Sequence, residues 1–280
     1  MGAQRVGGPV IRTVAVAVTG VALLTSCGRL QAKQHPFPEA VGQSSASPGP
    51  SATATPRGSA SPIPTGSLPP DRLAELPADE LLKRARKAAG STPTVRVALR
   101  ASGEGETVAY DMLVDLNTGD FQGSMSLGSA HAEIRRIDGD AWIKADKAFW
   151  VSSAKAPSSV AETLSKKYVH VSQSMAGWEK FVGIAEIANP TLPLNVFRPK
   201  EKLSVRTLAG QQVIPVVGRS GPNTAILSLA LSQGLLPVRF EESDGAYMEW
   251  QYGVVVNVAK PPAGSTVEAP QGSGVHLPGA

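Results

Sequence analysis

The sequence has a single cysteine, Cys27, among its 280 residues. One thiol excludes a disulfide within the chain and any metal site built from cysteines. Long apolar runs are missing as well. The most apolar stretch, residues 14–24, has 11 residues and is interrupted by Thr19 and Gly20, whereas a membrane-spanning helix takes about 20 apolar residues. The sequence therefore predicts neither a disulfide-stabilised fold nor a membrane-spanning helix.

An excess of charge is also missing from most of the chain, although the formal net charge of the whole is +4. Five of the 27 basic residues and one of the 23 acidic residues precede residue 71, which leaves 22 of each in residues 71–280. A balanced domain of this kind offers no basic surface for nucleic acid. We therefore expect no nucleic-acid partner.

Catalytic signatures are the third absence. The chain contains no G-x-S-x-G, H-E-x-x-H, G-x-x-x-x-G-K or G-x-G-x-x-G pattern. His131 and His170 lie in strand-like contexts, and solvated strand or turn positions explain the acid pairs Asp111/Asp115 and Asp138/Asp140. The sequence predicts no catalytic residue, no metal site and no cofactor, and hence a protein that is not an enzyme.

The N-terminus has the pattern of an export signal. Arg5 and Arg12 precede the apolar residues 14–24, and the stretch closes on Leu24-Thr25-Ser26-Cys27. This tetrapeptide resembles a bacterial lipobox, which implies cleavage after residue 26 and a diacylglycerol on Cys27. Several acyl chains anchor a protein stably to a membrane. We expect the mature protein on the extracytoplasmic face of the cell membrane; the alternative is an ordinary signal peptide with a chance cysteine.

Residues 27–70 form a segment rich in proline, serine, alanine, glycine and threonine. Such a composition has too little apolar surface to offset the entropy of ordering the chain. We expect a disordered linker with a root-mean-square reach of roughly 35 Å, either as a plain tether or in part as an O-glycosylated stalk.

A folded domain is expected over residues 71–264. Residues 78–90 predict a short amphipathic helix, with acids in its first turn and Gly90 as its stop. Alternating apolar residues between turn signals then predict a meander of antiparallel strands. The Asp-Gly pair at 138–139 is a strong hairpin signal. The five strands of this meander are expected at residues 94–101, 107–116, 121–127, 130–137 and 141–145.

The middle of the domain changes character. Residues 159–162 have a capping-box pattern that predicts a helix to about residue 167, and residues 168–171 predict a short strand. A helical stripe over residues 178–187 ends at Asn189-Pro190. Two apolar helices between two runs of strands predict a lid over one face of a sheet.

A second run of strands follows, and one of its members is ambiguous. Residues 225–233 fit a helical period as well as a strand, with Gly234 as a helix cap in the first case. Residues 265–280 are expected to be a flexible tail. The strands are expected at residues 202–208, 212–218, 224–231, 237–243, 246–252 and 254–259.

The fold class that these patterns predict is α+β, with an antiparallel sheet covered on one face by a few helices. Arg135, Arg136 and Lys144 alternate with apolar neighbours and fit either face. Large apolar side chains under the lid are the candidates for lining a cavity. They are Val97, Leu99, Tyr110, Met112, Val114, Met125, Trp142, Trp178, Phe181, Phe240, Met248 and Trp250.

Several segments in this order resemble the actinobacterial lipoproteins of the LppX/LprG type. After the lipobox and linker come DELLKRARKAA (79–89), GDAWIKADKAFW (139–150), KYVHV (167–171) and QYGVVVNVAKPPAG (251–264). The resemblance implies a curved half-barrel sheet, as in the LolA and LolB carriers. It also implies a hydrophobic cavity between sheet and lid for the acyl chains of lipids or glycolipids.

The sequence therefore predicts two alternative functions. The first is a membrane-anchored envelope lipoprotein that binds or carries lipid or glycolipid in such a cavity. The second is a non-enzymatic envelope sensor or scaffold that binds a protein partner through an exposed sheet face or edge strand.

Overall fold

The computed structural model describes residues 68–103, 106–173, 178 and 183–269. Six short α-helices lie in this part of the chain, of which α3 was expected at residues 78–90 and is confirmed. Pro77 precedes it, Asp79 and Glu80 occupy its first turn, and Leu81, Leu82, Ala85 and Ala89 form its buried stripe. The helices are α2 (Pro70–Glu75), α3 (Ala78–Ala89), α4 (Lys147–Ser152), α5 (Ser158–Leu164), α7 (Ile184–Ala188) and α8 (Thr191–Val196).

One curved, mostly antiparallel sheet organises the domain, as expected for the fold class. Its path runs β13-β6-β5-β4-β3-β2-β1-β12-β11-β10-β9-β7, with β8 also paired to β9. The meander of the first half is β1 (Thr94–Gly103), β2 (Glu106–Asp115), β3 (Phe121–Leu127), β4 (Ala130–Ile137) and β5 (Asp140–Ala145). The later strands are β6 (Tyr168–Val171), β7 (Phe197–Lys202), β8 (Arg206–Leu208), β9 (Gln211–Ser220), β10 (Asn223–Ala230), β11 (Leu236–Glu242), β12 (Tyr247–Tyr252) and β13 (Thr266–Glu268).

The hairpin between β4 and β5 has the expected turn. Asp138 and Gly139 both have positive φ, at 53° and 85°. Positive φ at both central residues is the geometry that matches the twist of the flanking strands, and Asp-Gly adopts it at low cost. The Asp-Gly pair therefore sets the register in which Ile137 pairs with Asp140.

Two faces of the sheet differ in chemistry. The inner face, which the helices cover, carries side chains such as Met112 and Ile134 that are at most 1% exposed. The opposite, outer face carries polar cross-strand pairs, including Arg96 with Asp111 at 2.8 and 2.6 Å. Cross-strand register joins one inner row over six strands: Val97, Met112, Gly123, Ile134, Ile143 and Val169.

The helix after residue 158 was expected with a capping box, and that detail is wrong. Pro157 occupies the N-cap position of α5 and has no side chain that could accept a hydrogen bond, so Ser159 and Glu162 lie inside the helix. Glu162 instead forms ion pairs with Lys147 at 3.4 Å and Lys166 at 3.1 Å. Proline before the first turn supplies the extended backbone at which a helix begins, without a polar cap.

The ambiguous residues 225–233 form a strand, β10, up to Ala230. They lack a clean alternation because both faces are covered. Leu227 and Leu229 pack in the main core, while Ala230 packs in a small second core with Val213 and Val238. An apolar run of this length fits a strand that is buried on both sides.

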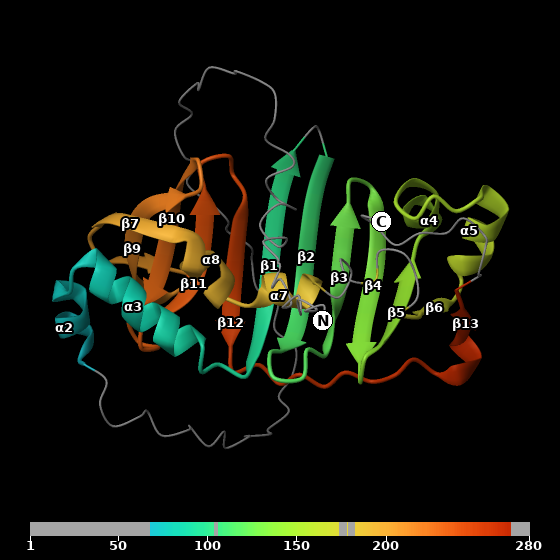
Figure 1. Cartoon of the computed structure of the whole chain (residues 1–280), viewed down its shortest axis with the longest axis horizontal. Coiled ribbons are helices and arrows are strands. Elements are labelled where there is room, and N and C mark those ends of the chain that lie inside the picture. Colours follow the sequence, from blue (N-terminus) through green and yellow to red (C-terminus); the bar gives the residue numbers. More distant parts are fainter. Residues whose placement is uncertain (1–67, 104–105, 174–177, 179–182, 270–280) are drawn as a thin grey trace, which may run out of the picture.

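The strand expected at residues 254–259 does not form. Thr94 Oγ1 donates to the carbonyl of Val254 at 2.8 Å, and Arg135 Nη1 donates to the carbonyl of Ala259 at 3.1 Å. The segment thus runs from β1 to β4, across the strands and past their ends (Figure 1). A segment that crosses strands cannot pair along one of them, although its side chains alternate between half-buried and exposed.

Order also continues beyond the expected domain end at residue 264. Within the part expected as a flexible tail, β13 pairs in parallel with β6, and Ala269 N donates to the carbonyl of His170 at 3.1 Å. The crossing segment brings β13 next to β6 at this edge of the sheet. The three residues of β13 alone do not predict a partner so far away in the sequence.

Gly123 gives a test of this packing. A methyl group on its Cα would overlap the backbone of Asp111 and Met112 on the adjacent strand. We expect Gly123→Ala to lower the free energy of unfolding by about 1–3 kcal/mol, as overpacking does, measured by urea unfolding. Gly264→Ala is the control, because nothing lies within 4 Å of its added methyl group. Equal stability of the two variants would contradict the packing described for the inner row.

Candidate functional site

The lid over the inner face near β1 and β12 consists of α7 and α8. The chain turns between them at Asn189-Pro190, as expected for the end of the first helix. The Asn189 Oδ1 accepts hydrogen bonds from the Thr191 backbone N at 3.0 Å and from its hydroxyl at 2.8 Å. Such an Asx turn fixes the direction in which α8 leaves the turn. The expected helix at residues 178–187 includes residues 179–182, which lie outside the described part of the chain.

Two side chains hold the lid helices by their last carbonyl groups. Arg86, on α3, donates to the Leu194 carbonyl from Nε at 3.1 Å and from Nη2 at 2.8 Å. Trp250, on β12, donates from Nε1 to the Ala188 carbonyl at 3.1 Å. The final carbonyls of a helix lack partners within it. These two donors therefore satisfy groups that a short helix leaves unpaired and fix the lid to α3 and to the sheet.

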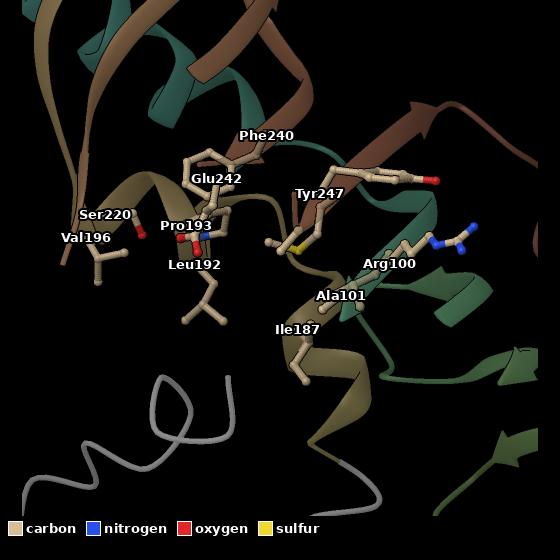
Figure 2. Close-up of a pocket in the computed structure, with 13 residues that line it drawn as sticks. Arg100, Ala101, Ile187, Leu192, Pro193, Val196, Ser220, Phe240, Glu242 and Tyr247 are labelled. Atoms are coloured by element: carbon tan, nitrogen blue, oxygen red, sulfur yellow. The ribbon is translucent and has the colours of Figure 1, made fainter. Parts of the chain in front are cut away.

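An apolar pocket of about 110 Å³ lies between this lid and the sheet. Its sheet wall includes Leu99, Ala101, Phe240 and Met248. Its lid wall includes Ile187, Leu192, Pro193 and Val196. Figure 2 shows Ile187, Leu192 and Phe240 around one open space.

The pocket exists because one inner row is less completely covered than its neighbours. Cross-strand register joins Phe240 to Met248, Met248 to Leu99 and Leu99 to Tyr110. Phe240 is buried, but the other three side chains are half-buried. In the next row along β1 and β2, Val97 and Met112 are at most 3% exposed. The lid thus leaves apolar surface open at this end of the sheet.

Several polar side chains that line or border the pocket point elsewhere or are already paired. The side chains of Arg100 and Tyr247 extend away from Leu192 and Ile187 (Figure 2). Glu242 accepts a hydrogen bond from Asn223 Nδ2 at 3.0 Å. Burial raises the pKa of the Tyr110 phenol, which therefore stays neutral at physiological pH. The walls are mostly apolar and can bind apolar groups, and Ser220 and Glu242 are the two other polar residues that line the pocket.

The structure places the twelve residues predicted to line a cavity in different environments. Leu99, Phe240 and Met248 line the pocket. Tyr110 and Trp178 are half-buried against the main core, and Phe181 lies outside the described residues. The remaining inner-face candidates are packed in the core: Val97, Met112, Val114, Met125 and Trp250.

Trp142 was predicted on the cavity side, and this is wrong. The residue lies on the outer face, where its ring centroid is 5.4 Å from that of His170 and 5.7 Å from Lys260 Nζ. Its neighbours Ala141 and Ile143 point inward and are fully buried. Because three apolar residues follow one another in β5, alternation alone could not assign the inward side. Arg135 and Lys144, which fitted either face, lie on the outer face beside Tyr168.

The sequence did not predict which residues form the lid wall of the pocket. Leu192, Pro193 and Val196 belong to α8, a six-residue helix that the sequence pattern does not predict. A signal was present: Asn189 precedes an apolar stretch with prolines near its start. Helices of one or two turns have too few residues to show a period, so this signal is weak.

His131 takes part in a local pair of side chains on neighbouring strands. His131 Nδ1 lies 2.8 Å from Ser126 Oγ, its direct cross-strand partner. Both carboxylate oxygens of Asp146 accept from backbone N–H groups, those of His131 and Phe149. Within residues 68–269, as far as they are described, no carboxylate contacts the His131 ring. The Ser–His contact is therefore a strand pair without the third group that orients a catalytic histidine.

No group of three or more His, Cys, Asp or Glu side chains in the described part of the chain is arranged to hold a metal ion. No helix in the same part of the chain has the length and apolar character needed to cross a membrane.

The fold is thus an α+β half-barrel with a helical lid and an apolar pocket. No protein-family model matches the chain, and no curated protein sequence matches it. Among solved structures, it is similar to the lipoprotein LppX of Mycobacterium tuberculosis, with a TM-score of 0.43, 15% identity, and coverage of 65% of this chain and 99% of LppX. It is also similar to an uncharacterised conserved protein of Thermus thermophilus, with a TM-score of 0.34, 14% identity, and coverage of 69% and 99%.

Trp250 gives a test of how the lid is held. Trp250→Phe removes the donor to the Ala188 carbonyl but keeps an aromatic ring in the core. We expect a loss of about 1 kcal/mol of stability and faster amide hydrogen exchange in α7. Trp142→Phe, on the outer face, is the matched control and leaves α7 exchange unchanged. Unchanged α7 exchange in Trp250→Phe would show that the hydrogen bond does not hold the lid.

Proposed function

We propose that this protein is a membrane-anchored envelope lipoprotein that binds lipid or glycolipid by the end of an acyl chain, without covalent chemistry. The observation that carries the proposal is the pocket between the sheet and α7–α8, whose walls are almost wholly apolar. A site whose walls expose mainly apolar side chains selects ligands largely by their apolar surface. An acyl chain is such a ligand, and it is abundant at a membrane.

The volume of the pocket limits what it holds. At about 110 Å³ it is smaller than the roughly 300–1,000 Å³ of sites that enclose a whole small ligand. It is closer to the ~150 Å³ engineered cavity that takes up benzene, a molecule of about six carbons. The pocket thus fits the terminal segment of one chain, with the rest of the lipid outside.

Half-buried side chains supply the driving force. Leu99, Leu192 and Met248 all keep part of their apolar surface exposed at the pocket. Covering such surface yields about 25 cal/mol per Å². A bound chain would complete the coverage that the lid leaves unfinished, and no backbone group would lose a hydrogen bond.

Support for the anchor comes from the sequence alone. Leu24-Thr25-Ser26-Cys27 follows an apolar stretch and two arginines, and Cys27 stands where a lipobox needs its cysteine. A diacylglycerol on Cys27 would keep the domain next to the bilayer, with a reach of roughly 35 Å for a flexible linker. The site would then face a constant supply of acyl chains.

The small pocket volume also favours a second candidate, a scaffold or sensor that binds an envelope protein. One apolar side chain of a partner would fill about 110 Å³ as well as a chain end does. The two candidates differ in whether free acyl chains bind the isolated protein. That difference can be measured directly.

Ala101→Phe tests the acyl-chain site. Ala101 lines the pocket at the end of β1 and is half-buried, so a phenyl ring there occupies the pocket without replacing a core side chain. We expect the variant to weaken binding of the fluorescent fatty acid cis-parinaric acid by about tenfold or more, equivalent to ~1.4 kcal/mol.

Ala98→Phe is the matched control, because Ala98 lies on the outer face of the same strand, opposite Asp111. It should bind cis-parinaric acid as the unmodified chain does. Absence of binding to the unmodified chain would favour the protein-partner candidate. Equal weakening by both substitutions would place the fatty acid away from the pocket.

Cys27→Ala tests the anchor. Without the thiol, no diacylglycerol can be attached, so the mass of the mature N-terminus should lose the lipid increment and the protein should leave the membrane fraction of its host. Cys27→Ala should leave the binding of cis-parinaric acid to the purified chain unchanged. Retention of the variant in the membrane fraction would contradict the role assigned to Cys27.

A further inference from the structure

The outermost strand segment of the sheet protrudes at one point. Lys202 of β7 pairs with Val216, and Arg206 of β8 pairs with Val213, both on β9. Three edge residues, 203–205, therefore face only two residues of β9, and Leu203 N donates to the Pro215 carbonyl at 2.8 Å. This is a β-bulge, which re-aims side chains at a sheet edge. We call residues 203–205 the edge bulge.

The edge bulge presents apolar side chains to solvent. Leu203 is 43% exposed and Val205 is 40% exposed, and both are among the most exposed large apolar residues in the described part of the chain. Ser204 between them is also exposed. Apolar side chains that protrude from a sheet edge favour contact with another apolar surface, such as a protein or a membrane.

Positive charge surrounds the edge bulge. Residues 198–206 contain four basic residues and one acid, Glu201, in a domain that is balanced overall. Arg206 also has Glu241 of β11 at 4.0 Å, and its side chain is 44% exposed. Arg198 lies directly opposite Arg219 on β9, and like charges in such a pair are destabilising. Their guanidinium groups donate to the carbonyls of Asn195 and Pro222 at 3.2 and 3.3 Å, which leaves their charges unneutralised by these contacts.

Charged edge strands also have a simpler role, since lysines and prolines prevent edge-to-edge pairing. That role explains Pro199 and Lys200 in β7. It does not explain Leu203 and Val205, because protection against pairing would place charges at the most protruding point of the edge. The combination of basic residues with protruding apolar ones needs another partner.

The start of the described chain indicates which partner this is. Lys202 Nζ donates to the Ala74 carbonyl at 2.5 Å, so α2 lies against the edge that carries the bulge. In Figure 1, α2 and β7 lie at the same end of the sheet. Leu68, which packs against the core, begins the described chain next to α2, and Cys27 precedes it by 41 positions. The chain therefore enters the domain at the end that carries the edge bulge.

We propose that the edge bulge and its basic neighbours form a docking surface for an anionic lipid bilayer. Leu203 and Val205 would enter the interface between headgroups and acyl chains, while Arg198, Lys200, Arg206 and Arg219 would face anionic headgroups. Basic residues near an anionic membrane attract it, and the attraction falls with added salt. The proposal shares the membrane setting of the proposed function but does not depend on the acyl-chain pocket.

Position 204 allows a direct test in the full chain. With Cys27→Ser, a Ser204→Cys substitution gives the only thiol, which is then labelled with an environment-sensitive fluorophore. Ser159→Cys, on α5 at the far end of the sheet, is the matched control. Each protein is mixed with vesicles of phosphatidylcholine alone or of phosphatidylcholine with phosphatidylglycerol.

We expect a blue shift at position 204 with the anionic vesicles, none with the neutral vesicles, and none at position 159. Lys200→Gln or Arg206→Gln should each weaken vesicle binding about fivefold, and Leu203→Ser with Val205→Ser should abolish the shift. Ala101→Phe should leave the shift unchanged, which separates this surface from the pocket.

Three results would overturn the proposal. One is no shift at position 204 with anionic vesicles. Another is an equal shift at positions 204 and 159, which would indicate adsorption through the apolar residues 14–24. The last is a shift at position 204 without vesicles that rises with protein concentration, which would show that a second copy of the chain covers the edge bulge.

Discussion

The apolar inner face of the sheet is the constraint on which the rest of the structure depends. Its strands turn one continuous set of apolar side chains to the same side, and burial of that set drives folding. The helices that the structure describes over it are short, from five to twelve residues. Helices of this length are unstable alone. They are held by packing and by bonds to their terminal carbonyls, as from Arg86 to Leu194 and from Trp250 to Ala188.

The pocket follows from the same constraint. Over most of the inner face, core residues such as Val114, Phe121 and Ile143 are fully covered. At the row of Met248 and Leu99 the lid helices end and turn, and coverage stops short. An apolar gap there is the least costly place for a binding site, because neither a hydrogen bond nor a core side chain has to be given up. The proposed function thus depends on an incompletely covered row of apolar side chains rather than on a cluster of polar ones.

Sequence reasoning predicted the first half of the fold closely. Alternation and an Asp-Gly turn suffice for β1 to β5, because each strand pairs with its neighbour in sequence. It failed where distant segments decide the outcome. The segment after Tyr252 alternates like a strand yet crosses the sheet, and β13 gains its partner only through that crossing. Trp142 was assigned to the wrong face because Ala141 and Ile143 flank it with equally apolar side chains.

The candidate site was predicted only in part, because local patterns identify its strand residues but not its helix residues. Leu99, Phe240 and Met248 belong to strands with clear patterns, and they do line the pocket. The lid wall comes from α8, which is too short to show a period. Local pattern shows which strand residues are apolar, but the order of strands in space decides which of them remain partly exposed.

The most direct test of the acyl-chain site is to locate a bound chain by NMR. Stearic acid with a nitroxide near its methyl end would be added to the protein with labelled methyl groups. The account predicts one bound molecule, with broadening of methyl signals concentrated on Leu99, Leu192, Val196 and Met248. Signals of those four residues that stay sharp while methyl groups elsewhere broaden, or no broadening at all, would contradict it.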